Sequence, residues 1–352
     1  MDAGAPQPRD AQSASPANAP PALHAPPAQP HRLPDFVEPG RGRTATTPLE
    51  IGLKGWIDIL LRVFERIGLD NLGLVTAGVT FYLFLAMIPA MIAVATFYGL
   101  WADSLTLANH VDFLAGYLPR QAILWIESEV ARVSNLSEDG LTLTLALSLV
   151  LSFWAMNNAV MALFGAMNVA YGEIEKRSLI ALYMRGFAVT GAALILGVAL
   201  VGIIVLVPIV FGSAIHTWHA KGPILTAPVM LTIVSLSSAA IFRLGPSRRA
   251  ARWRWIAVGA VVVAIGWIGA STLLSWYLSN IADYSRLYGS LGSIIALMFW
   301  FYVSVYILIL GAELNAELEH QTTVDTTVGP PQPQGRRGAY VADTVGRAAS
   351  FF

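Results

Sequence analysis

The sequence predicts an all-α, polytopic membrane protein with six transmembrane helices, and three observations support that fold class. Of the 352 residues, 55% are hydrophobic and only 12% are charged, so the chain is far more apolar than a soluble domain of this length needs to be. The apolar residues form uncharged stretches long enough for a helix to cross a hydrocarbon core of roughly 30 Å. The basic residues gather in alternate connections between those stretches, which is typical of membrane proteins oriented by charge.

Residues 1–48 are predicted to be a disordered tail, rich in proline and alanine. Few of its side chains are large and apolar, so folding would bury too little surface to offset the loss of chain entropy. The tail ends at Thr47-Pro48-Leu49-Glu50, which has the pattern of a capping box with proline at the first helical position. A helix is therefore expected over residues 49–70.

The helix over residues 49–70 is predicted to be amphipathic and to lie on the membrane surface. One face is apolar and consists of Leu53, Trp56, Ile57, Leu60, Phe64 and Ile67. The opposite face is charged and consists of Lys54, Asp58, Arg62, Glu65 and Arg66. Charges on one face exclude a span, so we expect an interfacial helix; the alternative is a helix packed on a soluble partner.

A membrane domain is predicted over residues 71–320. Its six spans are the uncharged stretches 72–101, 141–168, 186–212, 224–242, 255–278 and 288–310. Pro89 lies inside the first span and is expected to kink it, because proline removes one helical hydrogen bond. Residues 321–352 are predicted to be a second disordered tail.

The last span has distinctive residues at both of its ends. At its start, Gly289 and Gly292 each precede another small residue by four positions, an arrangement that lets a neighbouring helix approach closely. We therefore expect a helical partner there, and a homo-oligomer is one candidate arrangement. At its end, Gly311, Glu313 and Asn315 begin a stretch too polar for lipid, so we expect the span to stop in water or headgroups.

The distribution of basic residues predicts the orientation. All of the 22 Lys and Arg residues lie on one side of the predicted spans except Arg120, Arg132, Lys221 and Arg286. Basic loops stay in the cytoplasm. Both termini are therefore expected to be cytoplasmic, and the acidic loop 102–140 is expected to lie outside.

Several kinds of chemistry are disfavoured by composition. The chain has no Cys, which excludes disulfides and thiolate metal sites. Lys54, Lys176 and Lys221 are followed by Gly, Arg and Gly, so there is no phosphate-binding loop of the Walker type. The six predicted spans contain no Asp, Glu, Lys or Arg, which disfavours ion coupling at the midplane. We expect no cofactor and no metal site.

The basic stretch from Arg243 to Arg254 has two interpretations. It could be an RNA-binding patch. Because it lies between two predicted spans, cytoplasmic anchoring with contact to anionic membrane lipids accounts for it better. We therefore expect no nucleic-acid partner.

Uncharged polar residues at span depth are the candidates for a path that an amphiphile could follow. They can hydrate a headgroup without placing a fixed charge in lipid, and they are Thr80, Tyr82, Asn157, Asn158, Tyr302 and Tyr306. Asn157 and Asn158 must face protein or water, because an unpaired amide in lipid is costly. Tyr82 is the preferred candidate because it lies within a motif described next.

Three separated stretches resemble the YihY/virulence factor BrkB family. They are Ala77–Tyr82 with Pro89, Ala166–Gly172 with Glu175 and Arg177, and Tyr288–Gly292 followed by Gly311–Asn315. The resemblance implies a bacterial inner-membrane protein with six transmembrane helices, a role in the cell envelope, and a molecular activity that the family leaves open. An older label for the family, ribonuclease BN, is generally regarded as mistaken. The motif residues that could form a gate or anchor helix ends are Pro89, Asn168, Tyr171, Glu175, Arg177, Gly289, Gly292, Gly311, Glu313 and Asn315.

Two functions from different classes follow as expectations. One is transport or flipping of a lipid or other amphiphile, with membrane lipids as partners. The other is a non-transporting scaffold for envelope assembly, because small residues and buried amides serve helix packing equally well. A ribonuclease, or any other enzyme, is disfavoured because no cluster of carboxylates or paired His and Lys suited to RNA hydrolysis is visible in the sequence.

Overall fold

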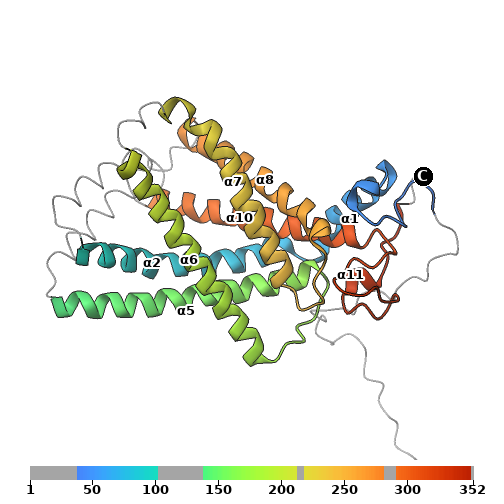
Figure 1. Ribbon diagram of the computed structural model, residues 1–352, viewed down its shortest axis with the longest axis horizontal. Helices are drawn as coiled ribbons and strands as arrows, with labels where there is room; N and C mark the ends of the chain where they lie inside the picture. The colour runs from blue at the N-terminus through green and yellow to red at the C-terminus, as the bar shows by residue number, and fades with distance from the viewer. Residues whose placement is uncertain (1–37, 102–137, 212–217, 281–290, 350–352) are drawn as a thin grey trace, which may run out of the picture. The chain divides into compact units, whose positions relative to one another are not determined.

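The computed structural model describes residues 38–101, 138–211, 218–280 and 291–349, and within these ranges the chain forms helices and no β-strand (Figure 1). A 3-10 turn precedes the α-helices. The elements are η2 Pro48–Glu50, α1 Leu53–Leu69, α2 Leu72–Trp101, α5 Glu138–Ala170, α6 Leu179–Phe211, α7 Trp218–Leu244, α8 Trp253–Asn280, α10 Leu291–Glu319 and α11 Tyr340–Asp343. This confirms the prediction of an all-α chain.

Five stretches of the described residues are long and apolar enough to cross a membrane. They are Leu72–Ala90, Thr142–Ala170, Leu179–Gly197, Trp253–Leu274 and Ile294–Glu319. A shorter apolar stretch, Pro228–Leu244, lies in α7. Multiple apolar helices of this length define a multi-pass membrane protein. Pro89 lies inside α2, which continues as a helix to Trp101.

The α10 helix occupies a central position. It contacts α8, α2, α1 and α5, and Figure 1 shows it between α8 and α2. One face of α10 carries the buried residues Val305, Ile309, Ala312 and Ala316, spaced three or four apart. Because that spacing matches the helical repeat, these side chains form one stripe, which packs in a core shared with α2, α5 and α8.

At the α8–α10 crossing the two backbones approach closely. A methyl group on Gly259 would collide with the Gly311 carbonyl and with Asn315, and one on Gly311 would collide with Val263. Asn315 lies one turn after Gly311 and bonds to the backbone of α8. Its Oδ1 accepts from the Gly259 N–H at 2.8 Å, and its Nδ2 donates to the Ile256 carbonyl at 3.1 Å. The Gly-x-x-x-Asn spacing thus fastens the two helices.

The α1 helix turns Asp58 and Arg62 of its predicted polar face toward the protein, together with Ile59 and Val63, and leaves much of its predicted apolar face outward. Asp58 and Arg62 are 1% and 7% exposed, whereas Leu53 and Phe64 are 78% and 77% exposed. The helix begins at Leu53 after Gly52, later than the predicted residue 49, because Pro48–Glu50 forms a separate 3-10 turn. Glu50 still accepts hydrogen bonds from the Thr46 N–H and the Thr47 hydroxyl, at 2.6 and 3.0 Å.

Residues 320–349, here called the C-terminal strap, are folded against the rest of the chain. Its backbone bonds to the α7–α8 loop, with Val328 N–H to the Ala250 carbonyl and Arg252 N–H to the Thr326 carbonyl, both at 2.9 Å. Further along, the Ala349 N–H donates to Asp58 of α1 at 2.9 Å. The prediction of a disordered tail over residues 321–352 does not fit this part of the chain.

The strap is ordered by hydrogen bonds more than by apolar burial, which is why composition suggested disorder. The guanidinium of Arg337 is 6% exposed and donates to the carbonyls of Gln332, Ala342 and Thr323. The Asp325 carboxylate accepts from the backbone N–H groups of Thr327 and Gln332. An estimate that counts large apolar side chains misses such contacts.

The end of the predicted N-terminal tail is also ordered, although the sequence predicted disorder over residues 1–48. Residues 1–37 lie outside the described residues, but Arg41, Arg43 and Ala45 are buried. The carbonyl of Arg43 accepts from the Thr323 N–H of the strap at 2.8 Å. The last residues of the predicted tail are therefore packed.

Candidate functional site

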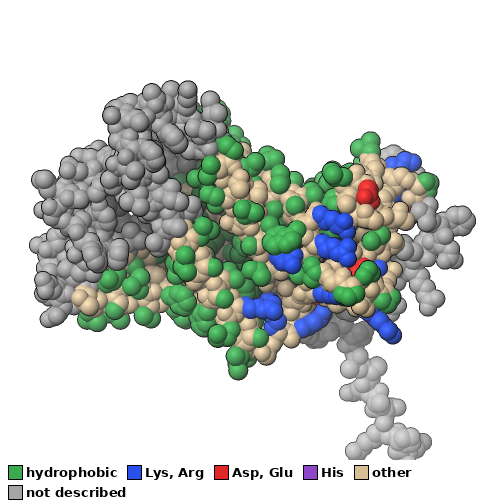
Figure 2. Space-filling view, viewed as in Figure 1, with side chains coloured by type: hydrophobic (Ala, Val, Ile, Leu, Met, Phe, Trp, Pro, Cys, Tyr) green, Lys and Arg blue, Asp and Glu red, His purple; other side chains and the backbone are tan. Residues whose placement is uncertain are grey.

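Buried polar groups occur in several parts of the described structure, and two of these regions are candidate functional sites. The first is a groove between α2 and α10, and the second, here called the polar end, comprises residues 41–70, 168–178, 243–256 and 311–349. Figure 2 shows Lys and Arg side chains gathered toward the end that carries α1 and α11. The described surface beyond them is mostly hydrophobic or neutral (Figure 2).

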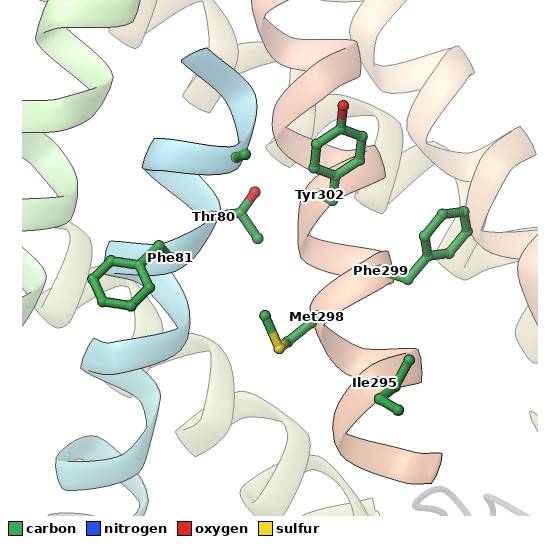
Figure 3. A pocket seen from close by; sticks show the side chains of 7 residues that line it. Thr80, Phe81, Ile295, Met298, Phe299 and Tyr302 are labelled. Atoms are coloured by element: carbon green, nitrogen blue, oxygen red, sulfur yellow. The ribbon is translucent and has the colours of Figure 1, made fainter. Parts of the chain in front are cut away.

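The groove is mainly apolar and has a volume of about 440 Å³ (Figure 3). Its lining residues are Ala77, Thr80 and Phe81 of α2, with Ile295, Met298, Phe299 and Tyr302 of α10. Phe81 and Phe299 are half-exposed, so the groove opens to the side of the helix pair. Its volume falls within the roughly 300–1,000 Å³ of typical small-molecule pockets.

The polar atoms of the groove are hydroxyls. Thr80 is 4% exposed, and its hydroxyl has no hydrogen-bond partner among the described residues. Thr76, one turn earlier on α2, is also buried, and its hydroxyl also has no hydrogen-bond partner among the described residues. The Tyr302 hydroxyl donates to the Gly73 carbonyl at 3.4 Å, and its ring stacks on Tyr306 with centroids 6.2 Å apart. The groove therefore offers an apolar wall with hydroxyls that can accept a further bond.

The structure brings together only some of the predicted path residues. Thr80 and Tyr302 line the groove, and Tyr306 packs behind Tyr302. Tyr82, the preferred candidate from sequence, does not line it; its ring is 39% exposed and packs on Phe81. Positions 80 and 82 lie two apart, so they point to different sides of a helix.

Asn157 lies at a different interface. It is 2% exposed, and its Oδ1 lies 2.7 Å from the position that a Cβ at Gly186 of α6 would take. That oxygen has no partner among the described residues, and the same holds for the hydroxyl of Thr190, one turn after Gly186. Asn158 is half-buried. Asn157 thus faces protein, as expected, but between α5 and α6 and outside the groove.

The motif that follows α5 forms a compact set of hydrogen bonds. Gly172 adopts a positive φ of 62° at the end of the helix, a conformation that favours glycine. Asn168 donates to Glu175 at 2.9 Å and accepts from the Ser247 N–H at 2.7 Å. Arg177 donates to both oxygens of Glu175, at 2.7 and 2.6 Å, and to the Gly245 carbonyl at 2.8 Å. These residues tie the α5–α6 connection to the α7–α8 loop.

The charge on Glu175 is stabilised by these contacts. The Arg177 side chain, followed by the Arg177 N–H and the Asn168 amide, lowers the pKa of Glu175 to about 2. An ionised carboxylate with a bidentate guanidinium partner is a strong, directional contact. Arg177 therefore anchors helix ends in this structure.

A second buried pair joins the α7–α8 loop to α10. Arg248 donates to Glu319 at 2.5 Å, and both side chains are at most 1% exposed. The Arg248 guanidinium also lies 4.2 Å above the ring of Tyr171. Burial alone would lower the pKa of Arg248, but the Glu319 charge raises it above its ordinary value. Since its carboxylate partner is equally buried, Arg248 is held within the protein.

Two further basic residues of the α7–α8 region also have internal partners. Arg243 donates to the Ala251 carbonyl at 2.8 Å, and Arg252 donates to the Thr327 carbonyl at 2.9 Å. A patch that binds RNA needs guanidinium groups free to reach phosphates. These contacts favour the structural interpretation of the basic stretch.

A third set of charges surrounds Glu317. Its carboxylate accepts from Arg62 at 2.5 Å and lies 3.6 Å from Arg66 and 3.4 Å from the ring of His320. Arg62 also donates to Gln321 of the strap at 2.8 Å. These contacts join α1, α10 and the strap.

Glu313 differs from the other carboxylates of the polar end. It is fully buried, and neither of its oxygens has a hydrogen-bond partner among the described residues. Arg177 bonds to Glu175 and to carbonyls of residues 244 and 245, so it is not a partner of Glu313 in this structure. The polar stretch after Gly311 thus remains helical and buried by protein, where water or headgroups were expected.

Several residues of both regions escaped the sequence analysis. The groove residues Ile295, Met298 and Phe299 look like ordinary apolar residues of a span, although Met298 and Tyr302 share a helical face at a spacing of four. The Arg248–Glu319 and Arg62–Glu317 pairs join residues 71 and 255 positions apart. A single sequence contains no signal that shows which of its distant charged residues form a pair. Gly289 lies outside the described residues, and Gly292 is buried at the start of α10.

The polar clusters show no metal-binding geometry within the described ranges: no group of three or more His, Asp or Glu side chains is placed to hold a metal ion.

The fold and the buried polar groups together define a polytopic helical membrane protein, and comparison with known sequences gives its family. The model of the virulence factor BrkB family matches residues 63–336. The chain therefore belongs to the virulence factor BrkB family.

Three relatives indicate the breadth of the similarity. The ribonuclease-like protein YfkH of Bacillus subtilis is 29% identical over 277 residues, which cover 74% of this chain and 95% of that protein. A UPF0761 membrane protein of Methylibium petroleiphilum is 24% identical over 81% of this chain and 68% of its own length. Another from Albidiferax ferrireducens is 24% identical over 76% of this chain and 64% of its own length. No solved structure matches the chain.

Proposed function

We propose that this protein binds a lipid or other amphiphile in the groove between α2 and α10 and moves it across the membrane. The observation that carries the proposal is the side opening of an apolar groove whose buried Thr80 hydroxyl has no partner among the described residues. A groove at span depth that opens sideways suits a ligand that arrives from the bilayer. The acyl chain would contact Met298 and Phe299, and polar atoms of the ligand would bond to the hydroxyls.

The proposal includes a membrane arrangement. We assign α7 as a sixth span, since it runs from Trp218 to Leu244 and its apolar part adjoins α8. We place the polar end in the cytoplasm of a bacterial cell, in the inner membrane, because basic residues concentrate there. The outward apolar face of α1 would then lie in the membrane surface while its polar face holds the strap.

The orientation is tested by cysteine labelling, which has no background because the chain contains no Cys. Single cysteines replace Ser137, in the predicted outer loop, and Gln334, an exposed residue of the strap. An impermeant thiol reagent added to intact cells should label Ser137→Cys and should reach Gln334→Cys only after permeabilisation. The reverse pattern would overturn the orientation.

Transport is tested by reconstituting the protein in vesicles that contain a fluorescent phospholipid. An impermeant quencher is added outside, and the measurement is the loss of protection of the inner-leaflet lipid. We expect movement above that in empty vesicles, reduced at least several-fold by Ala77→Trp, which fills the groove. The matched control is Leu74→Trp, on the same helix at a residue that is 76% exposed. Equal rates in the two variants would refute the groove as the path.

A scaffold without transport is the second candidate. It is favoured by the buried ion pairs that join α1 and the α7–α8 loop to α10 at the polar end, because such pairs hold the elements in one arrangement. Absence of lipid movement by the folded parent protein would favour this function. RNA hydrolysis is not part of either proposal.

A further inference from the structure

Glu313 is the one carboxylate of α10 within the described residues whose oxygens both lack a hydrogen-bond partner, and neither proposed function uses it. Glu317 and Glu319, further along the same helix, are also buried, but each accepts hydrogen bonds from an arginine. The difference cannot be attributed to exposure, since all three are at most 3% exposed. The distinguishing property of Glu313 is its lack of a partner.

The charged groups around Glu313 do not supply a cation for it. The charged groups that act on it electrostatically are Asp70 at the end of α1, Arg66 one turn earlier, and Glu317 on α10. Arg66 already lies 3.5 Å from Asp70 and 3.6 Å from Glu317. A charged Glu313 would therefore be a third carboxylate beside one guanidinium, in a position that water does not reach.

The other elements packed around α10 do not change this balance. The phenol of Tyr171, after α5, is buried and its hydroxyl has no hydrogen-bond partner among the described residues. From the strap, His320 lies beside Glu317, and Tyr340 lies near Arg66. The sequence of α2 contains no charged residue, and the only one in α8, Arg254, is exposed.

A metal cation is a poor occupant of the same position. Hard cations bind several oxygen ligands at once. The side-chain oxygen of Asn315, two residues away on α10, already accepts from the Gly259 N–H at 2.8 Å. A proton needs only one of the two Glu313 oxygens, and it removes the buried charge.

We propose that Glu313 is a proton-binding site, protonated while α1, α10 and the strap are packed together. When these elements separate and water enters, the carboxyl gives its proton to water, leaving a hydrated carboxylate and a hydronium ion. Repacking requires the reverse transfer, in which one proton returns to one oxygen of Glu313. One proton would thus be coupled to each opening and closing of the polar end, whatever the protein carries.

The experiment measures the carbonyl stretching band of a protonated carboxyl group by infrared spectroscopy on the full chain in nanodiscs. At neutral pH we expect this band in the parent protein and in Glu317→Gln, since Glu317 is ionised and paired with Arg62. We expect its loss in Glu313→Gln, which keeps the shape of the neutral acid. A parent protein without the band, or a band that survives Glu313→Gln, would overturn the proposal.

Two further measurements keep the test decisive. If Glu313→Gln does not fold, the band of the parent protein must shift on ¹³C-glutamate labelling and must persist in Glu175→Gln and Glu317→Gln. Loss of the band when Na⁺ replaces K⁺ at constant pH would indicate a cation site and contradict a proton site. None of these readouts depends on lipid movement, so the proton site and the proposed transport can fail independently.

Discussion

At the polar end, most buried polar side chains are paired with a partner from another element, whereas in the groove between α2 and α10 the Thr80 hydroxyl has no partner among the described residues. Arg248 and Glu319 are both buried and bond at 2.5 Å, while Thr80 is equally buried and bonds to no described residue. Paired charges fix the positions of the elements that carry them. Unpaired hydroxyls cost stability and are retained where a ligand can use them. This difference supports a holding role for the polar end and the binding role proposed for the groove.

The largest effect is expected from breaking the Arg248–Glu319 pair. Arg248→Met should lower the free energy of unfolding by about 3–5 kcal/mol, because it leaves Glu319 buried without its cation. Reversible denaturation in detergent micelles measures the change. Arg347→Ala is the control, since Arg347 pairs with Glu65 but is 69% exposed, and it should cost only about 0–1 kcal/mol. A loss below about 1 kcal/mol for Arg248→Met would mean that the pair does not hold the polar end.

A pH-dependent effect is expected from Glu175. Its pKa of about 2 lies below the ordinary value of 4.5, so its contribution to stability is complete above pH 4.5 and is lost as the pH falls toward 2. The melting temperature of the parent protein should therefore fall over that interval relative to its value at pH 7. Glu175→Gln should show a shallower fall, because it removes this titration. Parallel curves for the two proteins would show that the Arg177 contact does not stabilise the fold.

The smallest effect on stability is expected in the groove. A matched pair of threonine variants, one in the groove and one in the strap, tests the difference between the two regions. Thr80→Val should not lower the free energy of unfolding, because its hydroxyl has no partner among the described residues to lose. Thr322→Val should cost about 0.5–1.5 kcal/mol, since this fully buried hydroxyl of the strap donates to the Ala45 carbonyl at 2.7 Å. Equal losses in the two variants would contradict the difference drawn between the regions.

The sequence by itself determined the class of protein and most of its helices. Long uncharged stretches form helices in lipid, because a helix satisfies its backbone hydrogen bonds internally. This is why α2 and α8 follow the predicted stretches closely, whereas α10 continues past the predicted end at residue 310 to Glu319. The motif residues Gly311 and Asn315 could be selected from sequence as well, since their helical spacing of four places them on one face.

Tertiary structure decided which side of each helix faces which neighbour. The amphipathic pattern of α1 predicted two faces, but only the contacts with Arg41, Glu317 and Ala349 show that Asp58 and Arg62 pack inward. The choice between Thr80 and Tyr82 as a groove residue depends on the rotation of α2 against α10. The folded strap and the isolated Glu313 depend on contacts between residues hundreds of positions apart. A local pattern cannot specify these contacts, because their energies exist only after distant segments have met.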